Sequence, residues 1–342
     1  MNPKEKILKY LEGKESVTGK ALSEFLGISR QAVNKHLKEL IKNGRVVKEG
    51  ATKGVVYKSS AAKRGVRPVR RLRKTYHLSG LEEHEVFREL ASLLNFKSLL
   101  SKSALDIVRY AFTEILNNAV EHSKSSTCYI DVSLDQYRFH FRIRDFGIGI
   151  FHSIFTKFSL PDENAAVGDL IKGKTTTMRE KHTGEGVFFT SKSADIVSFR
   201  SHKINLIFDN LKRDVFVEER KSIKGTGVDF SISRRSRKRL DKVFAQFAPE
   251  EFEYKFEKTF VLVKLFQKDY VSRSEAKRLL SGLDKFREII LDFKGVKSIG
   301  QGFADELFRV FMNAHPDITI KAENLSPSLK PVIDHVVDNK IN

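Results

Sequence analysis

The stretch FTEILNNAVEHS, Phe112 to Ser123, decides how the centre of this 342-residue chain is interpreted. Its Glu114, Asn118 and His122 recur every four residues, so on a helix they line one face. The wider segment 103–123 carries a separate apolar stripe, which predicts an amphipathic helix. A polar stripe of this kind is more often a solvated face than a site, so its meaning depends on the segments that follow it.

Two segments with strict alternation of apolar and polar residues come next, TCYIDVSL (127–134) and YRFHFRIRD (137–145), and each predicts a strand. In the second, the register places Asp145 on the same face as the apolar residues Phe141 and Ile143. A carboxylate on a buried face needs a partner. Asp145 is therefore a candidate binding residue.

Three glycine-containing motifs accompany these strands. Glycine lets the backbone turn sharply and approach a ligand closely, and the second motif opens a predicted short helix whose free N–H groups suit phosphate oxygens. The third motif is expected at the start of a strand. The residues concerned are Gly147 and Gly149 in DFGIGI, Gly184 and Gly186 in HTGEGV, and Gly225 with Thr226 in KGTGV.

These elements stand in the order and spacing of the gyrase-like, histidine-kinase-like ATP-binding family, which the chain resembles over about residues 80–235. The resemblance implies an α/β two-layer sandwich that binds ATP with Mg²⁺. It implies that Asn118 binds the Mg²⁺ bridging the phosphates and that Glu114 orients or deprotonates the attacking group. Asp145 would accept from the adenine amino group, with Thr226 nearby. The phosphate and adenine walls would be formed by Gly147, Gly149, Gly184 and Gly186.

Thirty-four residues with little clear periodicity separate the first two glycine motifs. A connection of this length is usually functional, and we expect a lid over ATP, with Lys172, Lys174 and Arg179 reaching the phosphates. The same segment contains GDLIKGKT, Gly168–Thr175, which matches the P-loop pattern. A P-loop follows a buried apolar strand, whereas SLPDENAAV precedes this motif, so the P-loop is the weaker alternative.

The N-terminal part of the chain predicts three short helices and a two-stranded hairpin. The second helix starts after Thr18 and stops at Gly27, and the third has Ser29 as its N-cap. Over roughly residues 3–58 the chain resembles the winged helix-turn-helix DNA-binding family, with LGISRQAVNKHLKEL matching the turn and recognition helix. A protein-binding winged helix with a solvated basic face is the alternative.

The distribution of charge favours DNA as the partner of this segment. Residues 1–75 hold 20 Lys or Arg against six Asp or Glu, a net charge of +14 out of +19 for the whole chain. The resemblance implies two sets of contacts, one with the major groove and one with phosphates. The groove would be met by Arg30, Gln31, Asn34 and Lys35, and the phosphates by Lys48, Lys53 and Lys58.

A new alternation of strands and helices begins after residue 247, including a helix with Ser272 and Glu275 as a capping box, and it predicts a small mixed sheet. This part resembles the STAS-like domain often found behind such ATPases, which implies a protein partner. Related anti-sigma-factor antagonists carry a phosphorylated serine where this chain has Gly300, Gln301 and Gly302. We therefore expect a docking domain rather than a phosphorylation switch.

We expect four segments: a winged helix-turn-helix domain (1–60), a basic linker (61–79), a histidine-kinase-like ATP-binding domain (80–240) and a STAS-like α/β domain (247–342). The function expected is an ATP-binding, ATP-hydrolysing DNA-binding regulator, in which nucleotide state controls binding to DNA or a partner. TEILNNAVEHS looks closer to the anti-sigma-factor serine kinases than to gyrase or the chaperones, so a serine/threonine protein kinase acting on a partner is one alternative. A binding module whose nucleotide only orders the fold is another.

The remaining expectations concern compartment and assembly. The chain has no signal peptide and no run of eighteen apolar residues, which indicates a cytoplasmic protein without a membrane partner. Cys128 is the only cysteine and is expected to be buried, so disulfides within the chain are excluded. A homodimer is expected by analogy, because helix-turn-helix proteins often bind DNA as dimers.

Overall fold

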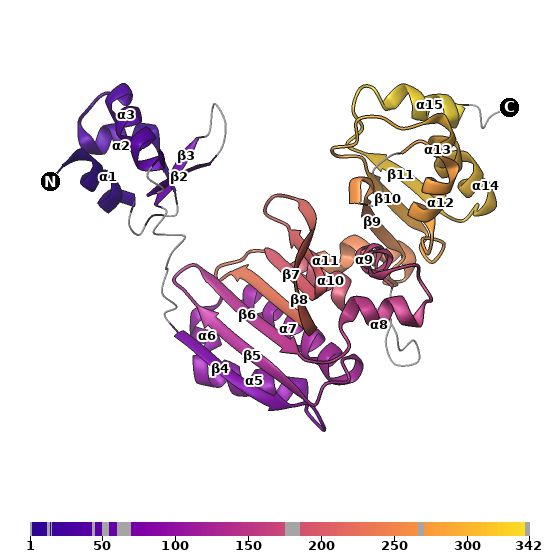
Figure 1. Cartoon of the computed structure of the whole chain (residues 1–342), viewed down its shortest axis with the longest axis horizontal. Coiled ribbons are helices and arrows are strands. Elements are labelled where there is room, and N and C mark those ends of the chain that lie inside the picture. The colour runs from indigo at the N-terminus through magenta and orange to yellow at the C-terminus, as the bar shows by residue number, and fades with distance from the viewer. Residues whose placement is uncertain are drawn as a thin grey trace. The chain divides into compact units, whose positions relative to one another are not determined.

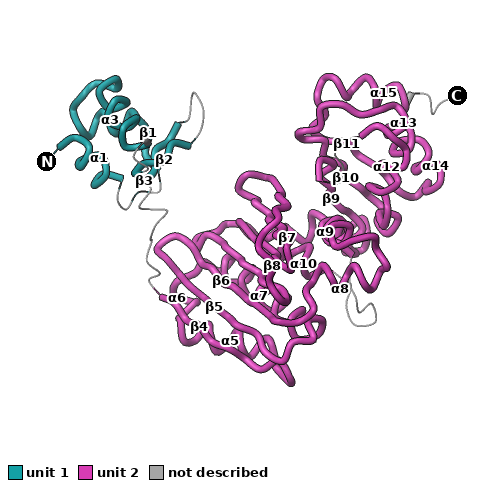
Figure 2. The backbone as a smooth tube through the Cα atoms, in the orientation of Figure 1, with its two compact units in different colours: residues 1–69 teal, residues 70–342 magenta. Residues whose placement is uncertain are grey.

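The computed structural model describes residues 2–11, 14, 16–42, 45–49, 55–59, 70–174, 185–265 and 270–338. The chain divides into two compact units, residues 1–69 and residues 70–342 (Figure 2). Within the described ranges, no helix is long and apolar enough to cross a membrane.

The N-terminal unit contains three helices and a small antiparallel sheet. These elements are α1 (Pro3–Leu11), β1 (Val17–Thr18), α2 (Gly19–Leu26), α3 (Arg30–Lys42), β2 (Val46–Glu49) and β3 (Val56–Ser59), with the strands in the order β1-β3-β2. Thr18 caps α2 by accepting from Ala21 N at 3.2 Å, and Gly27 ends the helix in the left-handed conformation. Ser29 caps α3 by accepting from Ala32 N at 3.3 Å. The predicted helices and hairpin are confirmed.

A single apolar core holds this unit together. Helix α3 contributes Val33, Leu37 and Leu40, which recur at helical spacing and are at most 3% exposed. Burying side chains of this size contributes ~1.5–3 kcal/mol each. Since one face of α3 is fixed in the core, its opposite face is held outward in a defined orientation.

The second unit is built on a five-stranded antiparallel sheet in the order β4-β5-β6-β8-β7 (Figure 1). Helices cover one face, and the strands alternate buried and more exposed residues, so the predicted two-layer α/β sandwich is confirmed. The strands are β4 (Arg70–His77), β5 (Thr127–Leu134), β6 (Arg138–Asp145), β7 (Ile196–Asp209) and β8 (Asp214–Ser233). The covering helices are α5 (Glu83–Leu94), α6 (Phe96–Leu99), α7 (Lys102–His122) and α10 (Gly186–Ser193).

Three expectations for this unit need correction. The linker expected to reach residue 79 is shorter, because Arg70–His77 pairs along its length with β5 as the edge strand β4. The segment between Gly149 and Gly184, which shows little periodicity in the sequence, contains two helices, α8 (Ile150–Lys157) and α9 (Glu163–Lys172). Thr226 lies well inside the long strand β8 rather than at a strand start.

A second, three-stranded sheet forms the C-terminal part of the same unit. Its strands, in the order β11-β10-β9, are β9 (Lys258–Leu262), β10 (Glu288–Asp292) and β11 (Thr319–Glu323). Both pairings are parallel, so the expectation of a mixed sheet is wrong for the described strands. Around it lie α12 (Arg273–Leu280), the helical stretch of α13 (Gln301–Asp305), η3 (Glu306–Val310) and α14 (Phe311–Ala314), and α15 (Lys330–Asp338). The predicted capping box of Ser272 and Glu275 is confirmed at the start of α12.

The turn before α13 is closely packed at Gly300. Its N–H donates to Tyr270 O at 2.6 Å, and a Cβ added at Gly300 would lie 2.5 Å from Val271 O. Such a contact is shorter than any side chain tolerates without movement of the backbone. A serine at position 300 would therefore not fit this turn as it stands.

An aromatic cluster joins the two sheets of this unit. Phe188 of α10 packs edge-to-face against Phe247, the last residue of α11 (Leu240–Phe247), with ring centroids 4.9 Å apart. Phe256 lies 4.5 Å from Phe188 and 5.3 Å from Phe286, both measured between ring centroids. The rings are fully buried or nearly so, and aromatic pairs of this kind add ~0.5–1.5 kcal/mol beyond the area they bury. Helix α10 therefore packs in the apolar core of the five-stranded sheet and also in that of the three-stranded sheet.

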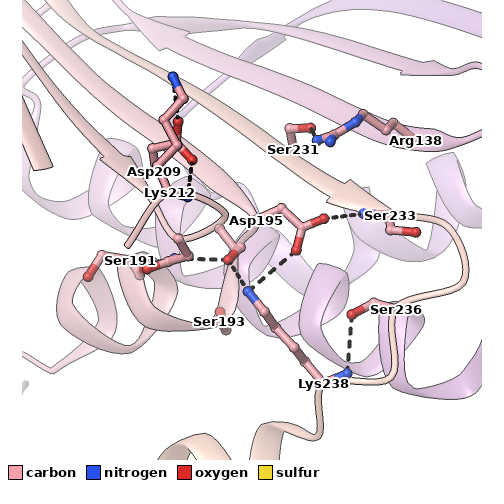
Figure 3. Close-up of polar contacts among 12 residues, drawn as sticks. Arg138, Ser191, Ser193, Asp195, Asp209, Lys212, Ser231, Ser233, Ser236 and Lys238 are labelled. Carbon is pink, nitrogen blue, oxygen red and sulfur yellow. Dashed lines mark hydrogen bonds and ion pairs between the residues drawn. The ribbon is translucent and has the colours of Figure 1, made fainter. Parts of the chain in front are cut away.

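A buried polar network fixes the far end of α10 (Figure 3). Asp195 is 5% exposed; its Oδ2 accepts from Ser233 N at 2.8 Å, and its Oδ1 lies 3.4 Å from Lys238 Nζ. Lys238 Nζ also donates to Ala194 O at 2.5 Å. Because the Asp195 carboxylate is buried, losing its partners would leave an uncompensated charge, so these contacts link the end of α10 to β8 and to the approach to α11.

Candidate functional site

A cavity of about 410 Å³ lies in the second unit, within the size range of small-molecule sites. It is lined by residues of α7, α8, α9, α10 and α11 and of strands β6, β7 and β8. Segments far apart in the sequence therefore meet here. Six residues predicted from the sequence line it: Glu114, Asn118, Asp145, Gly149, Gly186 and Thr226.

Helix α7 supplies one wall of the cavity. Its other face is packed in the core, where Val108, Phe112 and Leu116 are at most 1% exposed. The cavity-lining side chains therefore recur every four residues: Tyr110, Glu114, Asn118 and His122. Tyr110 extends the stripe by one turn and was missed in the sequence interpretation, although its i−4 spacing from Glu114 was a usable signal.

Asp145 forms the floor of the cavity and is 4% exposed, so the burial predicted from register is confirmed. Its Oδ1 accepts from Gly147 N at 2.9 Å and from Thr226 N at 3.1 Å. Burial raises the pKa of the Asp145 carboxyl above its ordinary value, and these backbone hydrogen bonds oppose that shift. An ionised carboxylate accepts about four hydrogen bonds, so capacity remains for a donor on a ligand.

Gly225 lets strand β8 approach this carboxylate closely. Its φ is +75°, and an added Cβ would lie 2.4 Å from Asp145 O and 2.6 Å from Asp145 Oδ1. Only glycine adopts this conformation at no steric cost in a space so restricted. The glycine therefore positions Thr226, whose hydroxyl oxygen accepts from Ile150 N at 2.9 Å, beside Asp145.

The acidic end of the cavity is formed by Glu114 and the start of α10. An added Cβ at Gly186 would lie 1.9 Å from Glu114 Oε2, so the carboxylate lies directly against the first residue of that helix. The positive end of a helix favours such a negative group. The pKa of the Tyr110 hydroxyl is raised above its ordinary value. Burial is the main cause, and the negative charges of Glu114 and Glu185 add to it. Glu185 was not predicted from the sequence.

Models of three protein families match separate parts of the chain: a winged helix-turn-helix DNA-binding family over residues 4–47, a histidine kinase-like ATPase domain over residues 81–207, and a STAS-like domain of unknown function over residues 275–330. The chain joins these three domains. A comparison with curated proteins finds no relative that matches it. The ATPase domain extends beyond its matched residues, since β8 lies between β6 and β7 in the same sheet.

Two residues predicted for the nucleotide site of the ATPase domain do not line the cavity. Gly147 lies behind Asp145 and acts on it through the N–H hydrogen bond. Lys174 points to the STAS-like domain, where its Nζ lies 3.0 Å from Glu257 Oε2 and 2.7 Å from Lys285 O. Its assignment to the phosphates is wrong for this conformation, because these acceptors hold the ammonium group elsewhere.

Lys172 likewise belongs to the boundary between the ATPase and STAS-like domains. It is 3% exposed, and its Nζ donates to Ser281 O at 2.7 Å, while its carbonyl oxygen accepts from Thr259 Oγ1 at 2.6 Å. Burial lowers the pKa of the Lys172 ammonium group to about 8. The P-loop alternative also fails here, because Gly168 and the residues up to Lys172 are helical rather than a loop after a strand.

Most of the DNA-binding residues predicted for the winged helix lie on the surface of its described part. The exposed residues of α3 include Arg30, Gln31, Asn34 and Lys35, and on β2 Lys48 is exposed. Lys58 of β3 is paired with Glu49, with Nζ and Oε2 2.8 Å apart. Three predicted residues lie outside the described part of the chain: Lys53 in the wing, and Arg179 and Gly184 between α9 and α10.

The chemistry of the cavity residues fits an adenine nucleotide with Mg²⁺. At the Asp145 end, a buried carboxylate with remaining acceptor capacity faces the space that an adenine amino group would fill. At the α10 end, Asn118 offers an oxygen ligand of the kind that Mg²⁺ prefers, with the Glu114 carboxylate one turn away. The family itself points to nucleotide binding.

Proposed function

We propose that this protein is an ATP-binding and ATP-hydrolysing DNA-binding regulator, in which nucleotide state controls binding to DNA or to a partner. The observation that carries this proposal is the cavity in which Asp145, Asn118 and Glu114 meet, in a chain that also contains a winged helix. The direct test is a DNA titration of the full-length chain with and without nucleotide at fixed salt.

Each cavity residue has a role that suits its chemistry. Asp145, aligned by the N–H groups of Gly147 and Thr226, would accept from the adenine amino group and select adenine. Asn118 would hold Mg²⁺, which, when bound, neutralises charge on the phosphates. Glu114, one turn before Asn118 on α7, would orient or deprotonate the attacking group.

The packing of the lid supports a route from nucleotide to the STAS-like domain. Residues 173–185 connect α9 to α10, and both ends of this connection are held by that domain: the end of α9 through Lys172, the residues just after it through Lys174, and α10 through Phe188. A change at the nucleotide that moved either helix would therefore disturb the contacts with the STAS-like domain. We propose that this coupling reports nucleotide state to a protein partner of that domain.

Substitution of Arg30 by alanine should weaken DNA binding by roughly 1–3 kcal/mol if this residue reads a base edge. Lys48→Ala should instead weaken binding to all sequences alike and lower the salt dependence, because it removes a phosphate contact. Lys9→Ala, exposed on α1, is the matched control. The measurement is fluorescence anisotropy on a duplex selected from a random library. Equal effects of all three substitutions would argue against α3 as the recognition helix.

A further inference from the structure

A second group of ligating side chains lies beside the nucleotide cavity and has no part in the proposed function. It consists of His152 on α8, Glu163 at the start of α9 and His202 on β7. Glu163 Oε1 lies 3.2 Å from His152 Nδ1 and 2.8 Å from His202 Nδ1. The three ligand atoms all lie within 4.8 Å of one another, although the residues are far apart in the sequence.

The two separations from Glu163 Oε1, 3.2 and 2.8 Å, are close to the edge of a metal coordination sphere. Zinc binds histidine nitrogen and carboxylate oxygen at about 2.0–2.1 Å, which places neighbouring ligands of a tetrahedral ion about 3.3 Å apart. Two imidazoles and one carboxylate form a donor set that suits divalent first-row transition metals rather than Mg²⁺ or Ca²⁺, which prefer oxygen ligands alone. Three protein ligands leave a position for water.

The backbone around His202 is shaped to bring its side chain to Glu163. His202 has φ +48° and lies where the pairing of β7 with β8 is interrupted by register shifts. A bulge of this kind redirects a side chain that a regular strand would point elsewhere. The three side chains are 44%, 23% and 33% exposed, for His152, Glu163 and His202 respectively, so an ion can reach them from solvent.

The position of the group links it to the wall of the nucleotide cavity. His202 Nε2 would lie 3.3 Å from a Cβ added at Gly149, the cavity residue that precedes α8. An ion bound by His152, Glu163 and His202 would join α8, α9 and β7 by coordinate bonds. The other described group with metal-ligating residues, Glu82, Glu83 and His84, consists of neighbours in sequence, so no distant elements converge there.

We propose that His152, Glu163 and His202 bind one divalent first-row transition-metal ion with zinc-like ligand preferences. This site is separate from the Mg²⁺ expected with ATP and does not depend on the proposed function. It fixes the start of α9 against α8 and β7, beside the cavity wall at Gly149.

The test uses Co²⁺ as the probe, added to the full-length, tag-free chain after removal of metals by chelation and in the absence of nucleotide. We expect one equivalent of Co²⁺ to produce visible d–d absorption that Zn²⁺ displaces, and Zn²⁺ to raise the Tm of the protein. His152→Ala and His202→Ala should each weaken Co²⁺ binding by about 100-fold or more, since loss of an outer-sphere partner alone costs about 10–100-fold. His84→Ala is the matched control and should bind Co²⁺ like the wild type.

Glu163→Gln keeps a hydrogen-bond acceptor for both imidazoles, so it should fold like the wild type. It therefore tests metal binding even if the histidine variants do not fold. It should lose most of the Co²⁺ affinity with an unchanged circular dichroism spectrum. Two results would overturn the proposal. One is a wild-type chain that takes up no Co²⁺, which would make the group a hydrogen-bonded cluster only. The other is equal Co²⁺ affinity in wild type, His202→Ala and Glu163→Gln.

Discussion

Replacing Asp145 with asparagine should raise the dissociation constant for ATP about 100-fold or more, equivalent to roughly 3 kcal/mol. Oδ1 of Asp145 already accepts from the N–H groups of Gly147 and Thr226. Asparagine has only one acceptor oxygen. If that oxygen stays with the backbone donors, the side-chain NH₂ faces the adenine amino group, and two donors oppose each other. Isothermal titration calorimetry with ATP and Mg²⁺ measures the loss.

Two control variants separate this effect from general damage. Asp131→Asn removes a carboxylate of the same sheet that is paired with Arg71 and Arg73 on the uncovered face, so ATP binding should be unchanged. Lys174→Ala should change ATP affinity by less than about threefold, because Lys174 contacts the STAS-like domain rather than the cavity. Loss of ATP binding in Lys174→Ala with retention in Asp145→Asn would refute the site.

Glu114→Gln should lower the rate of ATP hydrolysis by about 10²–10⁴-fold while ATP affinity stays within about threefold. The substitution keeps the shape of the side chain against Gly186 but removes the group proposed to act on the attacking water. Removing a negative charge from beside the phosphates cannot weaken ATP binding through repulsion. The measurement pairs steady-state phosphate release with calorimetric ATP affinity.

Glu121→Gln is the matched control for this prediction. Glu121 lies on the same helix, does not line the cavity, and accepts from Asn117 Nδ2 at 3.3 Å, so turnover should remain close to that of wild type. Equal turnover in wild type and Glu114→Gln would mean that nucleotide only orders the fold. Transfer of labelled phosphate to a copurifying protein, in place of release, would favour the kinase alternative.

Features that depend on residues close together in the sequence were predicted correctly. The caps at Thr18 and Ser29 and the capping box of Ser272 with Glu275 depend on residues three apart, and each is present. The burial of Asp145 followed from the two-residue period of its strand. Because these rules act within one element, they can be applied before any fold is known.

The errors concern contacts between elements that are distant in sequence. Lys174 resembles a phosphate-binding lysine in the sequence, and only its tertiary contacts with Glu257 and Lys285 show where it points. β4 resembles a linker because it is an edge strand, with only Tyr76 among its eight residues buried. The convergence of His152 with His202 likewise follows from packing that no sequence period encodes.

The central claim is that nucleotide state and DNA binding are linked, and one titration tests it most directly. Full-length protein is titrated into a fluorescent duplex at one salt concentration, without nucleotide, with ATP and Mg²⁺, and with a non-hydrolysable ATP analogue. We predict that ATP changes the Kd for DNA by about fivefold or more in the wild type, and that Asp145→Asn shows no change. Identical wild-type binding curves, at ATP concentrations shown by calorimetry to saturate the cavity, would contradict the account.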